Sequence, residues 1–226
     1  MQNFQTLPTV QPPPNLKVHQ RVLDAAEELF ANNGFASVSM RDIASLAKAQ
    51  VSSLTYHFGS KDGLFEAVVA RRAEALCERR LAALDAALVA PSCNAESVLA
   101  AFMQPYLRLC ISDDAGWRNY AKLLAYVGQS PRWPELAEKY FNPTAHLFIN
   151  SLSSLFPNAD RSMIAQGFVF SAQLLAMSFS GTQRVTLITG GEISSDDLKA
   201  VSRALLAFCD SGLTKLAVSS AATATH

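Results

Sequence analysis

The sequence predicts an all-α protein, and three of its features indicate this class. Half of its 226 residues are hydrophobic and 17% are charged, which allows a substantial core and excludes global disorder. Stretches rich in Ala and Leu recur at helical spacing, whereas few stretches alternate as strands do. Gly and Pro, ten of each, are too few for a linker-rich chain. The length allows two modest domains or one larger one.

The chain is expected to begin with an arm without regular structure. Residues 1–15 contain four of the ten prolines and no charged side chain, which is typical of a disordered or polyproline-like segment. A first helix should follow, because apolar residues recur on one face of it at Val22, Leu23, Ala26, Leu29 and Phe30. Asn33-Gly34 can end this helix in a left-handed conformation, and Phe35 should then pack beneath the next elements.

Residues 37–66 predict two short helices joined by a tight turn, followed by a third helix. Ser39 can cap the first, and Asp42, three residues on, completes a capping box. The second should run from about Gln50 to Tyr56 or His57, and the three residues 47–49 leave room only for a turn. Gly59 can end it, with Ser60 capping the third helix. This is the outline of a helix-turn-helix, whose second helix enters the major groove of DNA.

The second helix has an unusual composition for a core element. Most of its side chains are short and form hydrogen bonds, and only Leu54 and Phe58, four residues apart, resemble packing anchors. A small amphipathic surface helix is one interpretation. A helix that reads bases is the sharper one, because Gln pairs with adenine edges, Ser and Thr with several bases, and Val51 could touch a thymine methyl.

The rest of the sequence predicts a long helix and then a helical domain. The long helix should extend from about Lys61 to Val89, roughly 40 Å at 1.5 Å per residue. Asn94 or Ser97 can cap the next helix, which contains Pro105 as a kink. Further helices are expected from Trp117, from Pro134 with a kink or break at Asn142-Pro143, at 160–180, and after a loop at Gly190-Gly191. Ser194 or Ser195 should cap the last of them, and residues from about 218 should be disordered.

The helix at 160–180 and the last helix are apolar on most faces and must be covered on most faces. Pairing with the same two helices of a second copy would give a four-helix interface. Both could instead lie at the centre of a monomer's core. The sequence pattern leaves these two arrangements open.

The N-terminal residues resemble a known family. RVLDAAEELFANNGF, SMRDIASLAKAQ and LTYHFGSKDGLFEAVV, within residues 18–70, are similar to the DNA-binding domain of TetR family transcriptional repressors. Two positions depart from the family pattern: Lys48 stands where the turn usually has Gly, and Thr55 stands in place of the habitual Tyr. The resemblance implies a helix-turn-helix DNA-binding domain (16–62), joined by the long helix to a ligand-binding and dimerisation domain (63–217), with a disordered tail (218–226).

The candidate site residues fall into two groups. For operator DNA we predict contacts from the turn, the reading helix and their flanks: Arg41, Lys48, Gln50, Val51, Ser52, Ser53, Thr55, Tyr56, His57 and Lys61. The resemblance implies phosphate contacts for Tyr56, His57 and Lys61, and Lys61 would also begin a helix, where N–H groups attract anions. It further implies a pocket for a small apolar, aromatic or acyl effector, with the candidates Phe102, Tyr106, Trp117, Tyr120, His146, Phe170 and Gln173.

The composition of the chain limits which other functions are possible. The net charge is zero, which is low for a DNA-binding protein, so we expect modest non-specific affinity that falls steeply with salt. Four scattered cysteines, with no metal-ligand spacing and no apolar signal segment, predict free thiols in the cytoplasm, with neither metal nor cofactor and no membrane segment. The interpretation is a ligand-responsive repressor that dimerises. A redox switch, an enzyme, an activator, or a helical adaptor without an inducer remain as alternatives.

Overall fold

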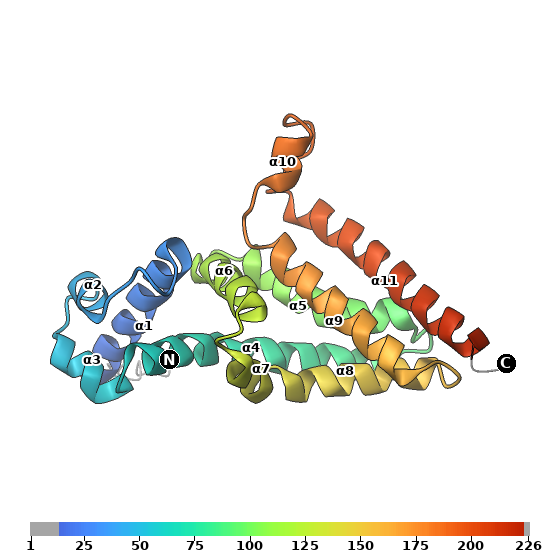
Figure 1. The fold of residues 1–226 in the computed structure, drawn as a ribbon, viewed down its shortest axis with the longest axis horizontal. Helices are drawn as coiled ribbons and strands as arrows, with labels where there is room; N and C mark the ends of the chain where they lie inside the picture. The colour runs from blue at the N-terminus through green and yellow to red at the C-terminus, as the bar shows by residue number, and fades with distance from the viewer. Residues whose placement is uncertain (1–13, 224–226) are drawn as a thin grey trace, which may run out of the picture. The chain divides into compact units, whose positions relative to one another are not determined.

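The computed structural model describes residues 14–223, and every regular element within them is a helix (Figure 1). The described helices are α1 (Pro14–Asn33), α2 (Met40–Leu46), α3 (Val51–Phe58), α4 (Lys61–Val89), α5 (Ala95–Cys110), α6 (Gly116–Gln129), α7 (Pro134–Tyr140), α8 (Asn142–Leu155), α9 (Arg161–Ser178), α10 (Arg184–Ile188) and α11 (Leu198–Thr223). No helix in this part of the chain is long and apolar enough to cross a membrane. The predicted all-α class is confirmed.

The chain divides into two compact units, the first ending at Val68 and the second beginning at Val69. This division lies inside α4, six residues beyond the predicted boundary at residue 62. The predicted arm, residues 1–15, lies outside the described residues except for its last two, which already belong to α1. The tail predicted from 218 is wrong through Thr223, because α11 continues to that residue. Residues 224–226 are not described.

A small aromatic core holds the first unit together. Phe30 of α1, Phe35 of the following loop and Phe65 of α4 contact one another, with ring centroids 5.2–5.5 Å apart. All three are buried, together with Ala26 and Val22, which lie one and two turns before Phe30. Edge-to-face and stacked arrangements of this kind add to the stabilisation from burial. The predicted apolar face of the first helix and the packing of Phe35 are therefore confirmed.

Local signals in the sequence set the ends of the short helices. The Ser39 N–H donates to Asp42 Oδ2 (2.8 Å), and the Asp42 N–H donates to Ser39 Oγ (3.2 Å), so the capping box is present. These hydrogen bonds hold the pKa of the Asp42 carboxyl below its ordinary value, with the Ser39 hydroxyl as the largest cause. Gly34 and Gly59 adopt φ angles of 78° and 71° at the ends of α1 and α3. Ser60 Oγ accepts from the Gly63 N–H at the start of α4 (3.1 Å).

In the second unit, α5 and α9 occupy central positions. Helix α5 contacts α6, α8 and α11, and helix α9 contacts α6, α8 and α11, as the ribbon shows (Figure 1). Their buried aromatic residues meet between the layers: Phe102 of α5 lies 5.3 Å from Phe148 of α8 and 4.8 Å from Phe168 of α9, measured between ring centroids. Helices α9 and α11 approach closely where α9 has Gly167, whose missing side chain leaves room for Leu213.

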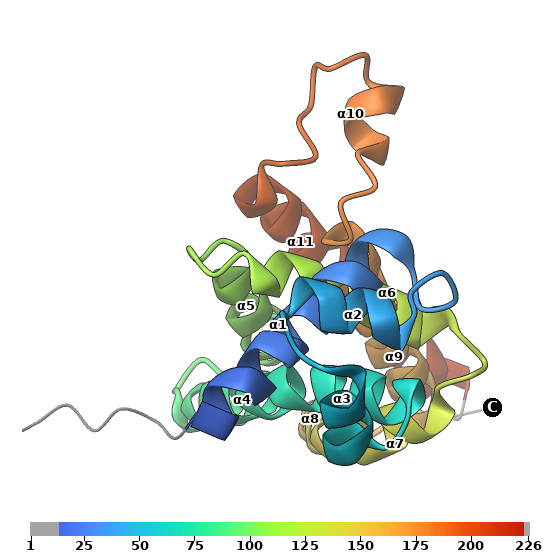
Figure 2. The ribbon, with the colours of Figure 1, turned by 90° about the vertical axis from the view of Figure 1, so that its left-hand side faces the viewer.

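Two elements differ in detail from the prediction, and a third shows which of two predicted alternatives holds. The Asn142-Pro143 pair splits the predicted helix into α7 and α8 at Phe141, since Pro cannot donate a backbone hydrogen bond. The short helix α10 was not predicted, and it projects from the other helices of its unit in both views (Figures 1 and 2). The predicted serine caps of α11 are wrong: Asp197 accepts from the Ala200 N–H (3.0 Å), whereas the Ser195 hydroxyl hydrogen-bonds with Thr186 (3.0 Å).

Candidate nucleic-acid interface and effector cavity

The turn between α2 and α3 is a left-handed helix ending built around Lys48. The Ala49 N–H donates to the Ala44 carbonyl (2.9 Å) and the Lys48 N–H to the Ser45 carbonyl (3.2 Å), which is the hydrogen-bond pattern of a Schellman motif. Lys48 occupies the position that requires a positive φ angle, 49°, which residues with a side chain rarely adopt. Its side chain is exposed. The turn therefore presents a cation immediately before α3 on a strained backbone.

Helix α3 buries side chains on one side and has exposed side chains on the other. Leu54 is fully buried and Phe58 is half-buried against His19 of α1, with ring centroids 5.0 Å apart. Both packing anchors that the sequence predicted are thus found. Of the ten residues predicted to contact DNA, those on or next to α3 are exposed except for the half-buried Ser53: Gln50, Val51, Ser52, Thr55, Tyr56 and His57.

Tyr56 is almost fully exposed on this helix. Its exposed fraction is 86%, although it is a large amphipathic residue that proteins usually cover in part. The neighbouring His57 ring lies 5.2 Å from it and 6.1 Å from the His19 ring, measured between centroids. An aromatic hydroxyl held in solvent at the end of α3 is suited to hydrogen-bond a phosphate.

Lys61 has a different environment from the one predicted. Its ammonium donates to the carbonyl oxygens of Val38 (2.7 Å) and Ala36 (3.4 Å), and it lies 4.3 Å from the centroid of the Phe35 ring. These contacts fasten the loop before α2 to the start of α4. In the described structure Lys61 therefore stabilises the first unit, and its predicted phosphate contact would compete with this role. Arg41 and Lys48 are exposed cations.

A cavity of about 230 Å³ lies within the second unit, and we call it the Arg80 cavity. Phe102 and Tyr106 of α5 line it together with Phe141 and with Phe168 of α9. Arg80 of α4 also lines it, although its side chain is only 6% exposed. An apolar cavity with one charged group is a common form of small-molecule site.

The cavity contains three of the seven residues predicted for ligand binding, namely Phe102, Tyr106 and Gln173. The other four lie outside this cavity. Trp117 and Tyr120 are buried beside each other, and the Tyr120 hydroxyl donates to the Val69 carbonyl (3.1 Å). His146 is exposed on α8, and Phe170 is 54% exposed on α9, because each lies on the side of its helix that faces away from the core.

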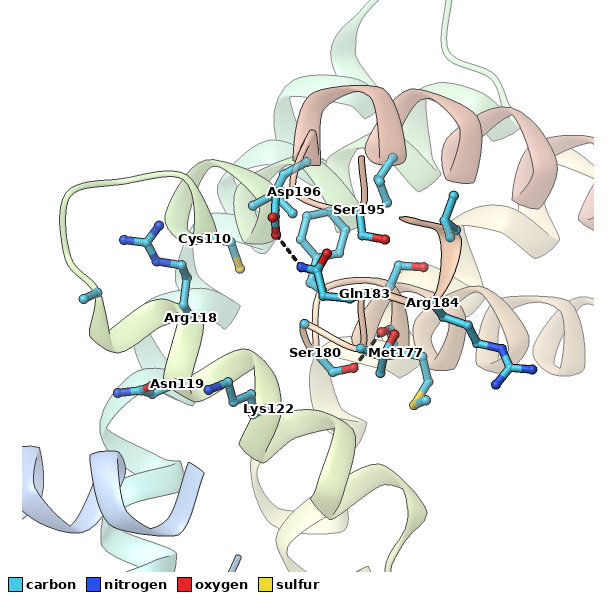
Figure 3. A pocket seen from close by; sticks show the side chains of 18 residues that line it. Cys110, Arg118, Asn119, Lys122, Met177, Ser180, Gln183, Arg184, Ser195 and Asp196 are labelled. Carbon is cyan, nitrogen blue, oxygen red and sulfur yellow. Dashed lines mark hydrogen bonds between the residues drawn. The ribbon is translucent and has the colours of Figure 1, made fainter. Parts of the chain in front are cut away.

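A second, larger cavity lies where the loop after α9 meets α6 and the start of α11 (Figure 3). Its volume is about 660 Å³, and its lining combines Arg118, Asn119 and Lys122 of α6 with apolar side chains such as Phe179, Val185 and Leu198. Gln183 Nε2 donates to Asp196 Oδ1 across it (2.6 Å). Most of its loop residues are exposed. None of the seven residues predicted for ligand binding lines it.

Sequence reasoning missed Arg80, the one charged residue that lines the Arg80 cavity in the described part of the chain. Its helix contains two Arg-Arg pairs, 71–72 and 79–80, and the helical period alone does not show which side chain turns inward. Arg79 is exposed and Arg80 is buried. Pro105 was the available signal, because a proline inside a helix disturbs its carbonyls. The Phe102 carbonyl, three residues earlier, accepts a hydrogen bond from Arg80 Nε (2.9 Å).

The fold and the exposed face of α3 define a DNA-binding transcription regulator of the helix-turn-helix class. Residues 22–68 match the model described as "Bacterial regulatory proteins, tetR family". Residues 100–212, half of the chain, match the model described as "Tetracyclin repressor-like, C-terminal domain". The protein belongs to the TetR family of transcription regulators.

Individual proteins with similar sequences are also transcription regulators. Over 49 residues the chain is 41% identical to the HTH-type transcriptional regulator UidR of Escherichia coli K12, which is 22% of this chain and 25% of that protein. Over 53 residues it is 43% identical to the HTH-type transcriptional repressor Rv3405c of Mycobacterium tuberculosis H37Rv, 24% and 28% of the two chains. The chain thus spans about a quarter of each of these curated relatives.

The likeness to solved structures extends over most of the chain. A TetR-like transcriptional regulator from Rhodococcus sp. RHA1 has a TM-score of 0.62 and 24% identity, covering 90% of this chain and 99% of that one. At this identity the likeness concerns the fold. Its extent shows that the two-unit helical architecture is that of the family throughout.

Proposed function

We propose that the protein is a ligand-responsive repressor that binds a near-palindromic operator as a homodimer and is released by a small apolar or aromatic molecule. Helix α3 enters the major groove, and the bound effector favours a form of the dimer that does not fit the operator. The observation that carries the proposal is the exposed face of α3, whose side chains are mostly polar although only Leu54 and Phe58 anchor the helix.

The composition of this face matches the edges of base pairs. Gln50, at the N-cap of α3, can bond to adenine through its amide, and Val51, 37% exposed, can contact a thymine methyl. Tyr56 and Lys48 flank them and are placed to contact phosphates, which position a protein on DNA without reading its sequence. The proposal therefore separates residues that determine sequence preference from residues that determine overall affinity.

Two exposed apolar stripes support the homodimer. On α9, Val169, Phe170, Leu174 and Met177 are 38–54% exposed at helical spacing, and on the neighbouring α11, Phe208 and Val218 are 68% and 57% exposed. Small residues lie beside Phe208, among them Ala204, Ala207, Ser211 and Gly212. Large exposed apolar patches mark association surfaces, and small residues let helices approach. A second copy placed on these stripes would form a four-helix interface.

The proposed release from DNA is a shift in population between a form of the dimer that binds the operator and a form that does not. A dimer with two recognition helices about one turn of DNA apart, ~34–36 Å, fits two half-sites. A ligand changes the fraction of this form only through its different affinity for the binding and non-binding forms. Helix α4 contributes Leu64 and Phe65 to the core of the first unit and Arg80 to the cavity of the second. This continuous helix is our candidate for the element that couples the two.

The test is a selection of the purified full-length protein against random duplexes at two salt concentrations. We expect an inverted repeat to be enriched. Gln50→Ala should change the preferred bases, at a cost of about 1–3 kcal/mol on the wild-type site, whereas Tyr56→Ala should weaken binding to all duplexes alike. Asn33→Ala, an exposed polar residue outside α3, is the matched control and should change neither.

Two outcomes would contradict the proposal. An unchanged preference for the Gln50→Ala variant would mean that α3 is not the reading element. No enrichment at either salt concentration, from protein shown to be folded and dimeric, would remove the repressor function and favour a helical adaptor.

A further inference from the structure

Arg80 is a buried cation without an anionic partner among residues 14–223. Its Nε donates to the Phe102 carbonyl (2.9 Å), and its guanidinium carbon lies 3.7 Å from the centroid of the Phe102 ring. The ionisable groups that interact with it are Cys77, Cys110, Tyr106 and Tyr120, and none of these is a carboxylate. Burial lowers the pKa of Arg80 to about 10, which leaves the guanidinium charged at neutral pH.

This arrangement leaves hydrogen-bonding capacity unused. A guanidinium has five N–H donors, and within the described structure only Nε has a hydrogen-bond acceptor. The stacking on Phe102 and the single carbonyl compensate part of the cost of burying the charge, but a buried charge is fully compensated only by a hydrogen-bonded partner. The planar end of Arg80 is thus prepared for an anion that offers two oxygen atoms.

The other side chains that line the Arg80 cavity determine the size and polarity of the group attached to such an anion. Phe102, Tyr106, Phe141 and Phe168 supply aromatic surface, and Leu124 and Ala172 supply aliphatic surface. The volume is about 230 Å³, whereas a dry cavity of about 150 Å³ holds one benzene molecule. The space therefore suits one aromatic ring with a short acidic substituent, or an acyl chain of roughly six to eight carbons.

Tyr106 provides a second polar group near the cavity. Its side chain is 1% exposed, and its hydroxyl has the Cys110 thiol, a weak hydrogen-bonding group, beside it. Burial raises the pKa of Tyr106 well above its ordinary value, so the hydroxyl remains a donor at neutral pH. Tyr106 and Arg80 both line the cavity. An acceptor bound to Arg80 would thus have a phenol donor in its vicinity.

We propose that the Arg80 cavity binds a small monocarboxylate with an apolar body, whose carboxylate pairs with the free end of the Arg80 guanidinium. This inference specifies the chemical class of the effector and rests on the proposed ligand response. It makes the negative charge of the ligand, and not only its apolar shape, a condition for binding.

The experiment measures binding to the full-length protein without DNA, by titration calorimetry. The probes are benzoate, phenylacetate, hexanoate and octanoate, each compared with its primary amide, which has nearly the same shape and no charge. We expect at least one acid to bind roughly 10- to 100-fold more tightly than its amide, the effect of a charge-assisted hydrogen bond. In Arg80→Met, which keeps the length and loses the charge, the acid and the amide should bind about equally.

Arg108→Met is the matched control, because Arg108 is an exposed arginine on α5 outside this cavity, and it should keep the preference for the acid. Amides that bind the wild-type protein as tightly as the acids, or no binding of any acid at millimolar concentration, would overturn the inference. This comparison needs no variant, so it holds even if Arg80→Met does not fold.

The same probes added to an operator complex separate the two proposals. Release of DNA by an amide but not by its acid would overturn the carboxylate inference and leave the ligand response intact. Selective binding of an acid without any change in DNA affinity would leave the carboxylate site intact and contradict its role as effector site.

Discussion

Single side chains account for most of the difference between what could be predicted from the sequence and what the structure shows. The capping box at Ser39 and Asp42 and the anchors Leu54 and Phe58 depend on neighbours within four residues, so the sequence alone predicts them. The burial of Arg80 depends on α5, far away in the sequence, and its neighbour Arg79 has the same chemistry and is exposed. Residue-level prediction therefore succeeded for the cap of α2 and the packing anchors of α3, and it missed the charged group in the cavity.

Lys48 yields a prediction at the same scale. Its φ angle of 49° is unfavourable for a residue with a side chain, so Lys48→Gly should stabilise the protein by about 1 kcal/mol. Because the substitution also removes an exposed cation beside α3, the slope of the logarithm of the operator affinity against the logarithm of the salt concentration should fall by about 1. Urea unfolding and DNA titrations at several salt concentrations measure the two effects.

Lys48→Asn separates the backbone from the charge, because Asn tolerates the left-handed conformation better than Lys and has no charge. It should show the altered salt slope with a smaller gain in stability. A Lys48→Gly protein less stable than the wild type would mean that the turn does not hold the positive φ angle.

At the scale of elements, the sequence predicted where helices occur better than where one helix ends and the next begins. Asn142-Pro143 indicated a kink or a break, and the structure shows the break, with Phe141 between α7 and α8. Helix α10 has five residues and no buried one, so it lacks the periodic apolar face from which helices are predicted. The cap of α11 was misassigned because four successive residues, 194–197, can all cap a helix.

The contact between α9 and α11 can be tested at Gly167. A Cβ atom at this position would lie 3.3 Å from Leu213 Cγ and 3.4 Å from Leu216 Cδ1. Gly167→Val should therefore lower the free energy of unfolding by about 1–3 kcal/mol, since overpacking forces the helices apart. Gly167→Ala adds only the Cβ atom and gains helix propensity of about 1 kcal/mol, so it should be nearly neutral. Denaturant unfolding of both variants measures these changes. If Gly167→Val were as stable as the wild type, the contact between α9 and α11 would be looser than the structure shows.

At the scale of the whole molecule, the sequence could not decide between a monomer core and a dimer interface for the last two long helices. An apolar helix requires a cover, and the periodicity does not say which chain supplies it. The structure shows that each helix buries one face within its own unit and leaves the other uncovered. Phe170 illustrates the consequence: predicted as a ligand contact, it lies on the uncovered face of α9.

The proposed dimer predicts a specific effect of charge on that face. Phe208→Asp, at a side chain that is 68% exposed, should convert the dimer to a monomer and abolish binding to an inverted repeat, because a buried unpaired carboxylate is strongly unfavourable. Sedimentation equilibrium and operator titration provide the two measurements. Leu147→Asp on α8, at a residue 47% exposed away from both stripes, is the control and should remain dimeric. A dimeric Phe208→Asp protein would place the interface elsewhere.

The proline in α5 should influence the ligand concentration at which such a regulator responds. Pro105 has no N–H to give to the Ala101 carbonyl, and the next carbonyl, that of Phe102, holds Arg80. The apparent affinity for any occupant of the cavity is the intrinsic affinity reduced by the fraction of molecules in which Arg80 is correctly placed. A substitution at position 105 should change the fraction of molecules in which Arg80 is correctly placed, and it leaves the charge of Arg80 unaltered. Substitutions there should move the threshold concentration up or down while the preference among ligands stays the same, so sensitivity and selectivity can evolve separately.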